Sequence, residues 1–216
     1  MEGAGQHRAE AGREADSSRR ERRRRLFAGV AVEATAELRR ALAELWEELP
    51  GEKIRWTRLE NLHLTVEFFG ATPEEKIPAL AAALAQAAAA TPAFGLELGG
   101  LGTFGSPRHP RVLWLGVESA GLARLRDEVA AVLRAAGWTP EARAFAPHLT
   151  LGRVERMKDP ERLAAAAERG RGRFVAEQAV AELVLYESRS GARGTEYAPL
   201  ATFPLMAAGA GGGEGA

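Results

Sequence analysis

The same four-residue pattern occurs twice in this chain, as HLTV at residues 63–66 and as HLTL at residues 148–151. Each copy lies in an apolar run with the alternation of a β-strand, in which His and Thr share one face and the aliphatic residues share the other. Each copy therefore presents an imidazole beside a hydroxyl on an apolar backing. This favours a fold that buries both aliphatic faces and turns both polar faces toward one space.

The hydrophobic pattern is continuous from about Arg25 to Met206. It predicts strands at 25–32, 62–70, 94–104, 111–117, 147–154, 179–188 and 195–205, and helices at 34–49, 73–90, 121–137 and 159–170. The order is roughly β-α-β-α-β followed by β-α-β-α-β-β, so the second half echoes the first. Neighbouring strands are close enough in sequence to pair antiparallel, which indicates the α+β class.

The two ends of the chain have a different composition. Residues 1–24 are expected to form a disordered, Arg-rich arm, and residues 207–216 a flexible Gly/Ala tail, which leaves 25–206 as the folded domain. The arm is either a solvated extension or a weak contact for RNA. The apolar run after it ends at Glu33 without a convincing cleavage site, so we reject a signal peptide.

Charge and cysteine content exclude several function classes. Lys+Arg and Asp+Glu both total 29, which argues against a protein that coats nucleic acid by bulk electrostatics but allows a small phosphate pocket. The chain has no Cys, so disulfides, thiolate metal sites and a Cys nucleophile are excluded, and a cytoplasmic location is expected. No apolar run approaches the ~20 residues of a membrane span.

Two histidines and two hydroxyls suit the opening of a cyclic phosphodiester. This reaction needs a base for the attacking water and an acid for the leaving ribose oxygen, and an imidazole can serve as either near neutral pH. The hydroxyls of Thr65 and Thr150 can donate to the non-bridging phosphate oxygens. His63 and His148 lack a third His or paired carboxylates at ligand spacing, so we expect no metal and no cofactor, with a zinc site as the alternative.

The paired motifs resemble the H-x-T-x signatures of the 2H phosphoesterase superfamily. Their surroundings are similar to its RNA 2′,3′-cyclic phosphodiesterase branch, also called 2′-5′ RNA ligases. The similarity extends over RLFAGVAV, RWTRLENLHLTVEFFG, GTFGSPRHPRVLWLGV, FAPHLTLGRV and VLYESRSGARGTEYAPLATFPL, which together span most of residues 25–206 in the family's order.

The resemblance implies two pseudo-symmetric α+β lobes, each an antiparallel sheet with helices outside, and an active-site cleft between the sheets. It also implies that His63 protonates the leaving 3′-oxygen, that His148 activates water, and that the product is a 2′-phosphomonoester. Nothing in the residues themselves distinguishes the two histidines. The implied partner is RNA with a 2′,3′-cyclic phosphate end, or a cyclic nucleotide, and no obligate protein partner is expected.

Two further residues are candidates for substrate binding. Strict alternation would place Arg153 on the face of Leu151, unless a twist or bulge brings its side chain to the site. Contact with phosphate and a structural salt bridge both remain open for Arg153. Tyr197 on the last strand either stacks on a base or packs internally.

Two other functions are compatible with the sequence. The same acid and base could run the reaction backwards as a reversible 2′-5′ RNA ligase. A non-catalytic module could instead hold the cyclic RNA end without turnover. An assay of RNA ends separates these alternatives, because hydrolysis consumes the cyclic phosphate and ligation joins it to a 5′-hydroxyl.

Overall fold

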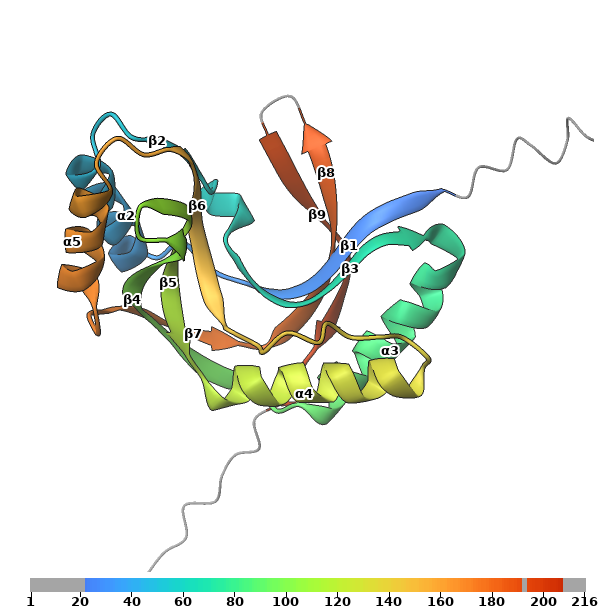
Figure 1. Cartoon of the computed structure of the whole chain (residues 1–216). Helices are drawn as coiled ribbons and strands as arrows, with labels where there is room; N and C mark the ends of the chain where they lie inside the picture. The colour runs from blue at the N-terminus through green and yellow to red at the C-terminus, as the bar shows by residue number, and fades with distance from the viewer. Residues whose placement is uncertain (1–21, 192–193, 208–216) are drawn as a thin grey trace, which may run out of the picture.

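The structure is a computed structural model that describes residues 22–191 and 194–207, and it contains two antiparallel β-sheets with four α-helices (Figure 1). The strands are β1 (Arg23–Ala31), β2 (Lys53–Trp56), β3 (His63–Pro73), β4 (Phe94–Ser106), β5 (His109–Glu118), β6 (His148–Arg156), β7 (Phe174–Val180), β8 (Glu182–Gly191) and β9 (Gly194–Pro204). The helices are α2 (Ala36–Glu48), α3 (Ile77–Ala90), α4 (Ala120–Ala135) and α5 (Pro160–Gly170). The α+β class expected from the sequence is confirmed.

Three of the four helices begin at a capping side chain. Thr35, Ser119 and Asp159 each accept a hydrogen bond from the backbone N–H three residues later, at the start of α2, α4 and α5 respectively. These caps satisfy N–H groups that have no partner within the helix. The helix positions therefore follow from short polar residues placed just before apolar periodic segments.

The strands form two sheets that mix distant parts of the chain. Sheet A has the order β3-β1-β8-β9, and sheet B has the order β2-β6-β5-β4-β7. Helices α3 and α4 pack against sheet A, while α2 and α5 lie on the outer side of sheet B, at the left of Figure 1. Leu64 and Leu149, the aliphatic residues of the two motifs, are at most 1% exposed, so the motif strands are anchored in the core.

The structure differs from the sequence prediction at two strands. The segment 179–188 is not one strand: it divides at Ala181 between β7, which pairs with β4 in sheet B, and β8, which pairs with β1 in sheet A. An apolar pattern alone does not show that a chain passes from one sheet to another. Strand β2 was not predicted, because four residues are too few to establish a period.

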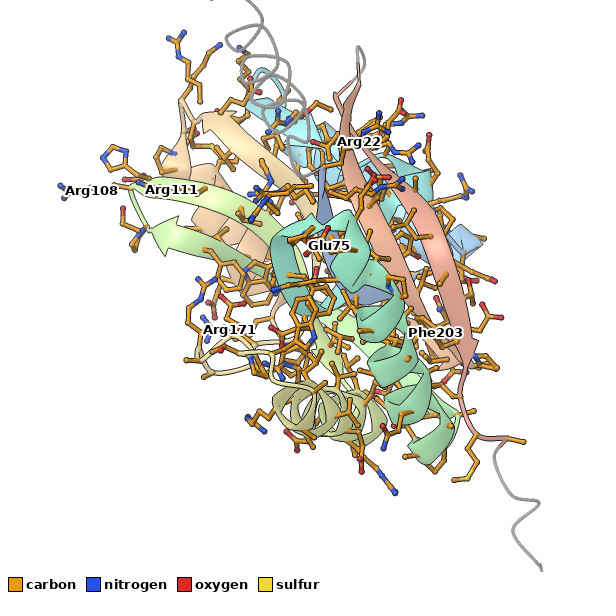
Figure 2. All side chains as sticks on the ribbon, turned by 90° about the vertical axis from the view of Figure 1, so that its right-hand side faces the viewer. Arg22, Glu75, Arg108, Arg111, Arg171 and Phe203 are labelled. Atoms are coloured by element: carbon orange, nitrogen blue, oxygen red, sulfur yellow. The ribbon has the colours of Figure 1, made fainter. Side chains whose placement is uncertain are left out.

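The described residues begin just before the start of the domain that was expected from the sequence. Strand β1 begins at Arg23, so the expected boundary at Arg25 falls inside it, and Arg24 forms ion pairs with Glu74 and Glu187. Most of the expected arm and tail lies outside the described residues. The segment between the strands expected at 94–104 and 111–117 contains the tip of the β4–β5 hairpin, where His109 is exposed and where Figure 2 shows Arg108 and Arg111 projecting outward.

Candidate active site

The two motif strands lie against each other where the sheets meet. Strand β3 is an edge strand of sheet A, β6 is the second strand of sheet B, and the two are in contact. We call the face of each sheet that carries its motif histidine the histidine face. The opposite faces hold the buried leucines. The topology thus brings together two motifs that are far apart in sequence, as expected from their shared pattern.

The two motifs share one pairing pattern, residue for residue. The partners are Ala31 for His63, Gly29 for Thr65, Gly116 for His148 and Trp114 for Thr150. The fourth motif residue, Val66 or Leu151, has no partner on the neighbouring strand, so each motif ends in a β-bulge. The two halves of the site are therefore pseudo-symmetric in backbone as well as in sequence.

The bulges change which face the next residues occupy. Arg153 pairs with Val112, which shares a face with Trp114, the partner of Thr150. Arg153 thus lies on the histidine face of sheet B rather than on the face of Leu151, where strict alternation would have placed it. Phe68 takes the equivalent position in sheet A and is 57% exposed.

Each imidazole is oriented by a backbone carbonyl two residues earlier. Nδ1 of His63 lies 2.7 Å from the carbonyl oxygen of Asn61, and Nδ1 of His148 lies 2.8 Å from that of Ala146. A carbonyl oxygen only accepts hydrogen bonds, so Nδ1 carries a proton in both rings. In a neutral ring Nε2 then holds the lone pair and is the atom available for proton transfer.

His63 lies among aromatic rings. Its ring centroid is 4.8 Å from those of Phe27 and Tyr197 and 6.2 Å from that of Tyr186. Burial lowers the pKa of His63 below its ordinary value, the carbonyl of Asn61 opposes this, and the charge of His148 lowers the pKa further.

His148 has a different aromatic environment. Its ring meets Phe104 edge-on at a centroid distance of 4.8 Å and lies 6.5 Å from Trp114. Trp114 lies flat across Gly102, where an added Cβ would come within 2.3 Å of the indole, so this position requires Gly. An open pocket of about 960 Å³ is lined by Trp114 and Gly116 together with residues of β4, α5 and the start of β7, and neither motif histidine lines it.

The two threonine hydroxyls have no partner within the described part of the protein. Thr65 and Thr150 are half-buried on the histidine faces, and no hydrogen bond to either hydroxyl occurs among residues 22–191 and 194–207. The hydroxyls are therefore not used by the fold around them, in contrast to the imidazole Nδ1 atoms, which are fixed by backbone carbonyls.

Tyr197 lies next to His63, with the two rings edge-to-face at an interplanar angle of 78°. Tyr197 was a candidate from the sequence, whereas Phe27, Tyr186, Phe104 and Trp114 were not. The signal available for them is their position: each is an aromatic residue on a strand, at a place where alternation turns it away from the buried leucines. The alternation pattern does not show which strands are neighbours in the sheets.

The described residues contain neither a metal-binding cluster nor a membrane-spanning helix. Among residues 22–191 and 194–207, no group of three or more His, Cys, Asp or Glu side chains is placed to hold a metal ion. None of the helices in those ranges has the length and apolar character needed to cross a membrane.

The sequence is similar to proteins named RNA 2′,3′-cyclic phosphodiesterase. It is 34% identical over 184 residues to an RNA 2′,3′-cyclic phosphodiesterase of Geobacillus stearothermophilus, a match that covers 83% of this chain and 57% of the relative. It is 35% identical over 133 residues to that of Thermotoga maritima and 36% identical over 139 residues to that of Archaeoglobus fulgidus. These matches cover 60% and 63% of this chain and 71% and 76% of those relatives.

Solved structures share the fold. A crystal structure of a Thermus thermophilus protein matches with a TM-score of 0.68 and 27% identity, over 85% of this chain and 98% of that one. The structure of E. coli LigT complexed with 3′-AMP matches with a TM-score of 0.65 and 29% identity, over 85% and 98% of the two chains. The profile of the 2′-5′ RNA ligase superfamily matches residues 38–192. The resemblance carried by the two H-x-T-x motifs is thus confirmed, and the chain belongs to the 2′-5′ RNA ligase superfamily.

Proposed function

We propose that this protein hydrolyses RNA 2′,3′-cyclic phosphodiester ends to 2′-phosphomonoesters, with His63 and His148 as general acid and base. The named activity of the Geobacillus, Thermotoga and Archaeoglobus relatives supports the reaction. The observation that carries the two-histidine mechanism is the matched pair of imidazoles, each with Nδ1 held by a carbonyl and Nε2 left for proton transfer.

The reaction needs two proton transfers. Water attacks phosphorus as His148 Nε2 removes its proton, the bond between phosphorus and O3′ breaks, and His63 Nε2 donates a proton to O3′. The products are a 2′-phosphate and a free 3′-hydroxyl. The assignment of acid and base follows the family resemblance, because the matched backbone geometry treats the two rings alike.

The acid role of His63 requires a charged ring. With Nδ1 already protonated, a donating Nε2 means an imidazolium, which burial disfavours in the free protein. The bound substrate changes this balance, since a phosphodiester carries a negative charge and a nearby anion favours the charged imidazole. Substrate binding would thus supply the protonated form that the reaction consumes.

Other side chains have roles around the phosphate. The hydroxyls of Thr65 and Thr150 donate to its non-bridging oxygens, where charge builds in the transition state. Arg153, on the same face as Thr150, adds positive charge to that wall of the site beyond the threonine, and Tyr197 next to His63 stacks on the terminal base. The match to E. coli LigT complexed with 3′-AMP supports a site for a nucleotide.

The test is to incubate the protein with a nucleoside 2′,3′-cyclic phosphate in EDTA and identify the product by ³¹P NMR. We expect turnover to the 2′-phosphate, and none with the His63→Ala/His148→Ala double variant. A 3′-phosphate product would overturn the assignment of O3′ as leaving group. Complete loss in EDTA that is restored by zinc would overturn the metal-free mechanism.

A further inference from the structure

Arg55 of β2 and Arg153 of β6 are direct partners across an antiparallel ladder. The next pair along, Trp56 and Gly152, faces the other way: Trp56 packs on Trp46 of α2, with ring centroids 5.7 Å apart. Because successive residues alternate, Arg55 lies on the histidine face of sheet B together with Arg153. Both arginines are exposed.

Within the described ranges, neither guanidinium has an acidic partner. Neighbouring cations do: Lys53 lies 3.1 Å from Glu155, and Arg58 pairs with Glu60 and Glu196. Like charges directly opposite each other destabilise a ladder. An anion between the two arginines would remove that repulsion.

Strand β2 also breaks the pseudo-symmetry of the site. The motif strand β3 of sheet A corresponds to β6 of sheet B, and its partner β1 corresponds to β5. However, β3 is an edge strand, whereas β6 lies between β5 and β2. Among the described residues, sheet A has no strand at the place of β2, and its counterpart of Arg153 is the uncharged Phe68. The cationic pair belongs to one wall of the site only.

We propose that Arg55, together with Arg153, binds the internucleotide phosphodiester that precedes the cyclic end of an RNA chain. This rests on the function proposed above and adds the substrate class, an oligonucleotide rather than a mononucleotide. Guanidinium groups bind phosphodiester oxygens through charge-assisted hydrogen bonds. Because of the bulge at Leu151, Arg153 lies two residue steps beyond Thr150 on the ladder, about 7 Å along the strand. That spacing separates this anion position from the phosphate at the threonines.

The test compares three substrates: a nucleoside 2′,3′-cyclic phosphate, a dinucleotide with the same cyclic end, and that dinucleotide with a neutral methylphosphonate linkage. We expect Arg55→Gln to lower kcat/KM about tenfold for the charged dinucleotide, the effect of one charge-assisted hydrogen bond. The variant should leave kcat/KM for the other two substrates unchanged. The matched control is Lys53→Gln, on the same strand but paired with Glu155, which should change none of the three.

Salt gives a second measurement. The fall of log kcat/KM with log salt for the charged dinucleotide should be shallower in Arg55→Gln by about one. An equal loss on the charged and neutral dinucleotides, or no loss on either, would overturn the phosphate site while leaving the hydrolase intact. No turnover of any substrate by the unaltered protein would instead overturn the proposed function.

Discussion

Glu67 of β3 and Arg126 of α4 form a buried ion pair, with 2.8 Å between a guanidinium nitrogen and Oε2. The Glu67 side chain is 1% exposed and that of Arg126 is 11% exposed. Both also bind the backbone of Glu141: its N–H donates to Oε1 of Glu67 at 2.8 Å, and its carbonyl accepts from Arg126 at 3.2 Å. The pair therefore ties the segment that leads into His148 to the strand that begins with His63.

This pair predicts a large loss of stability when one partner is neutralised. Glu67→Gln keeps the shape but leaves the Arg126 charge buried without its counter-ion, which should lower the free energy of unfolding by about 3–5 kcal/mol. Lys53→Gln breaks an exposed pair and should cost at most about 1 kcal/mol. Urea denaturation of both variants measures the difference. Equal effects would mean that the buried pair contributes no more than the exposed one.

The lowered pKa of His63 predicts a dependence of stability on pH. Its ordinary value is 6.5, and burial lowers it in the folded protein. Between the two values the unfolded chain holds more protons, so the free energy of unfolding falls as the pH falls through that window. The His63→Gln variant should lack this fall in the free energy of unfolding. The control variant His109→Gln, on the exposed hairpin tip, should keep it. Denaturation curves from pH 7 down to pH 5 test this, and an unchanged slope in His63→Gln would contradict it.

The same imidazole should respond to an anion in the site. An NMR titration of His63 in the free protein should give a midpoint below 6.5, and saturation with inorganic phosphate should raise it. The His63→Gln spectrum identifies the resonance. A midpoint that phosphate leaves unmoved would argue against an acid role that depends on bound charge.

Replacement of the site residues predicts a graded loss of activity. His63→Ala and His148→Ala should each lower kcat by ~10²–10⁴, and the double variant should lose much less than the product, because the two rings act in one step. Thr65→Val and Thr150→Val keep the shape and should each cost ~1–3 kcal/mol in kcat/KM. Steady-state kinetics on a cyclic mononucleotide measures all five. Wild-type rates in the Val variants would leave the hydroxyls without a catalytic part.

Truncation at the N-terminus should show where the folded domain begins. A chain that starts at Arg22 should keep full turnover of a cyclic mononucleotide, since the preceding segment has few apolar residues to bury. A chain that starts at Arg25 loses the ion pairs of Arg24 with Glu74 and Glu187 and should unfold at lower temperature. Equal melting temperatures would place the boundary at Arg25, as expected from composition alone.

The sequence singles out candidate site residues more readily than it shows which strands are neighbours in the sheets. His63 and His148 could be selected because a repeated motif is local information. The position of Arg153 could not be settled, because a bulge at Leu151 reverses the face and leaves no mark in an alternating pattern. The ring of Tyr186 near His63 depends on the pairing of β8 with β1, which no local period encodes.

That pairing also has a consequence for the order of folding. Arg24 and Glu187, which meet where β1 lies beside β8, are 163 residues apart in the chain. Contacts of such long range form late and slowly, because a long loop must close before they stabilise anything. During synthesis, β8 and β9, which bring Tyr186 and Tyr197 next to His63, leave the ribosome after both motifs. We therefore expect the surroundings of His63 to be completed only after Tyr197 has been synthesised, so that a nascent chain that already carries both motifs still lacks part of its candidate site.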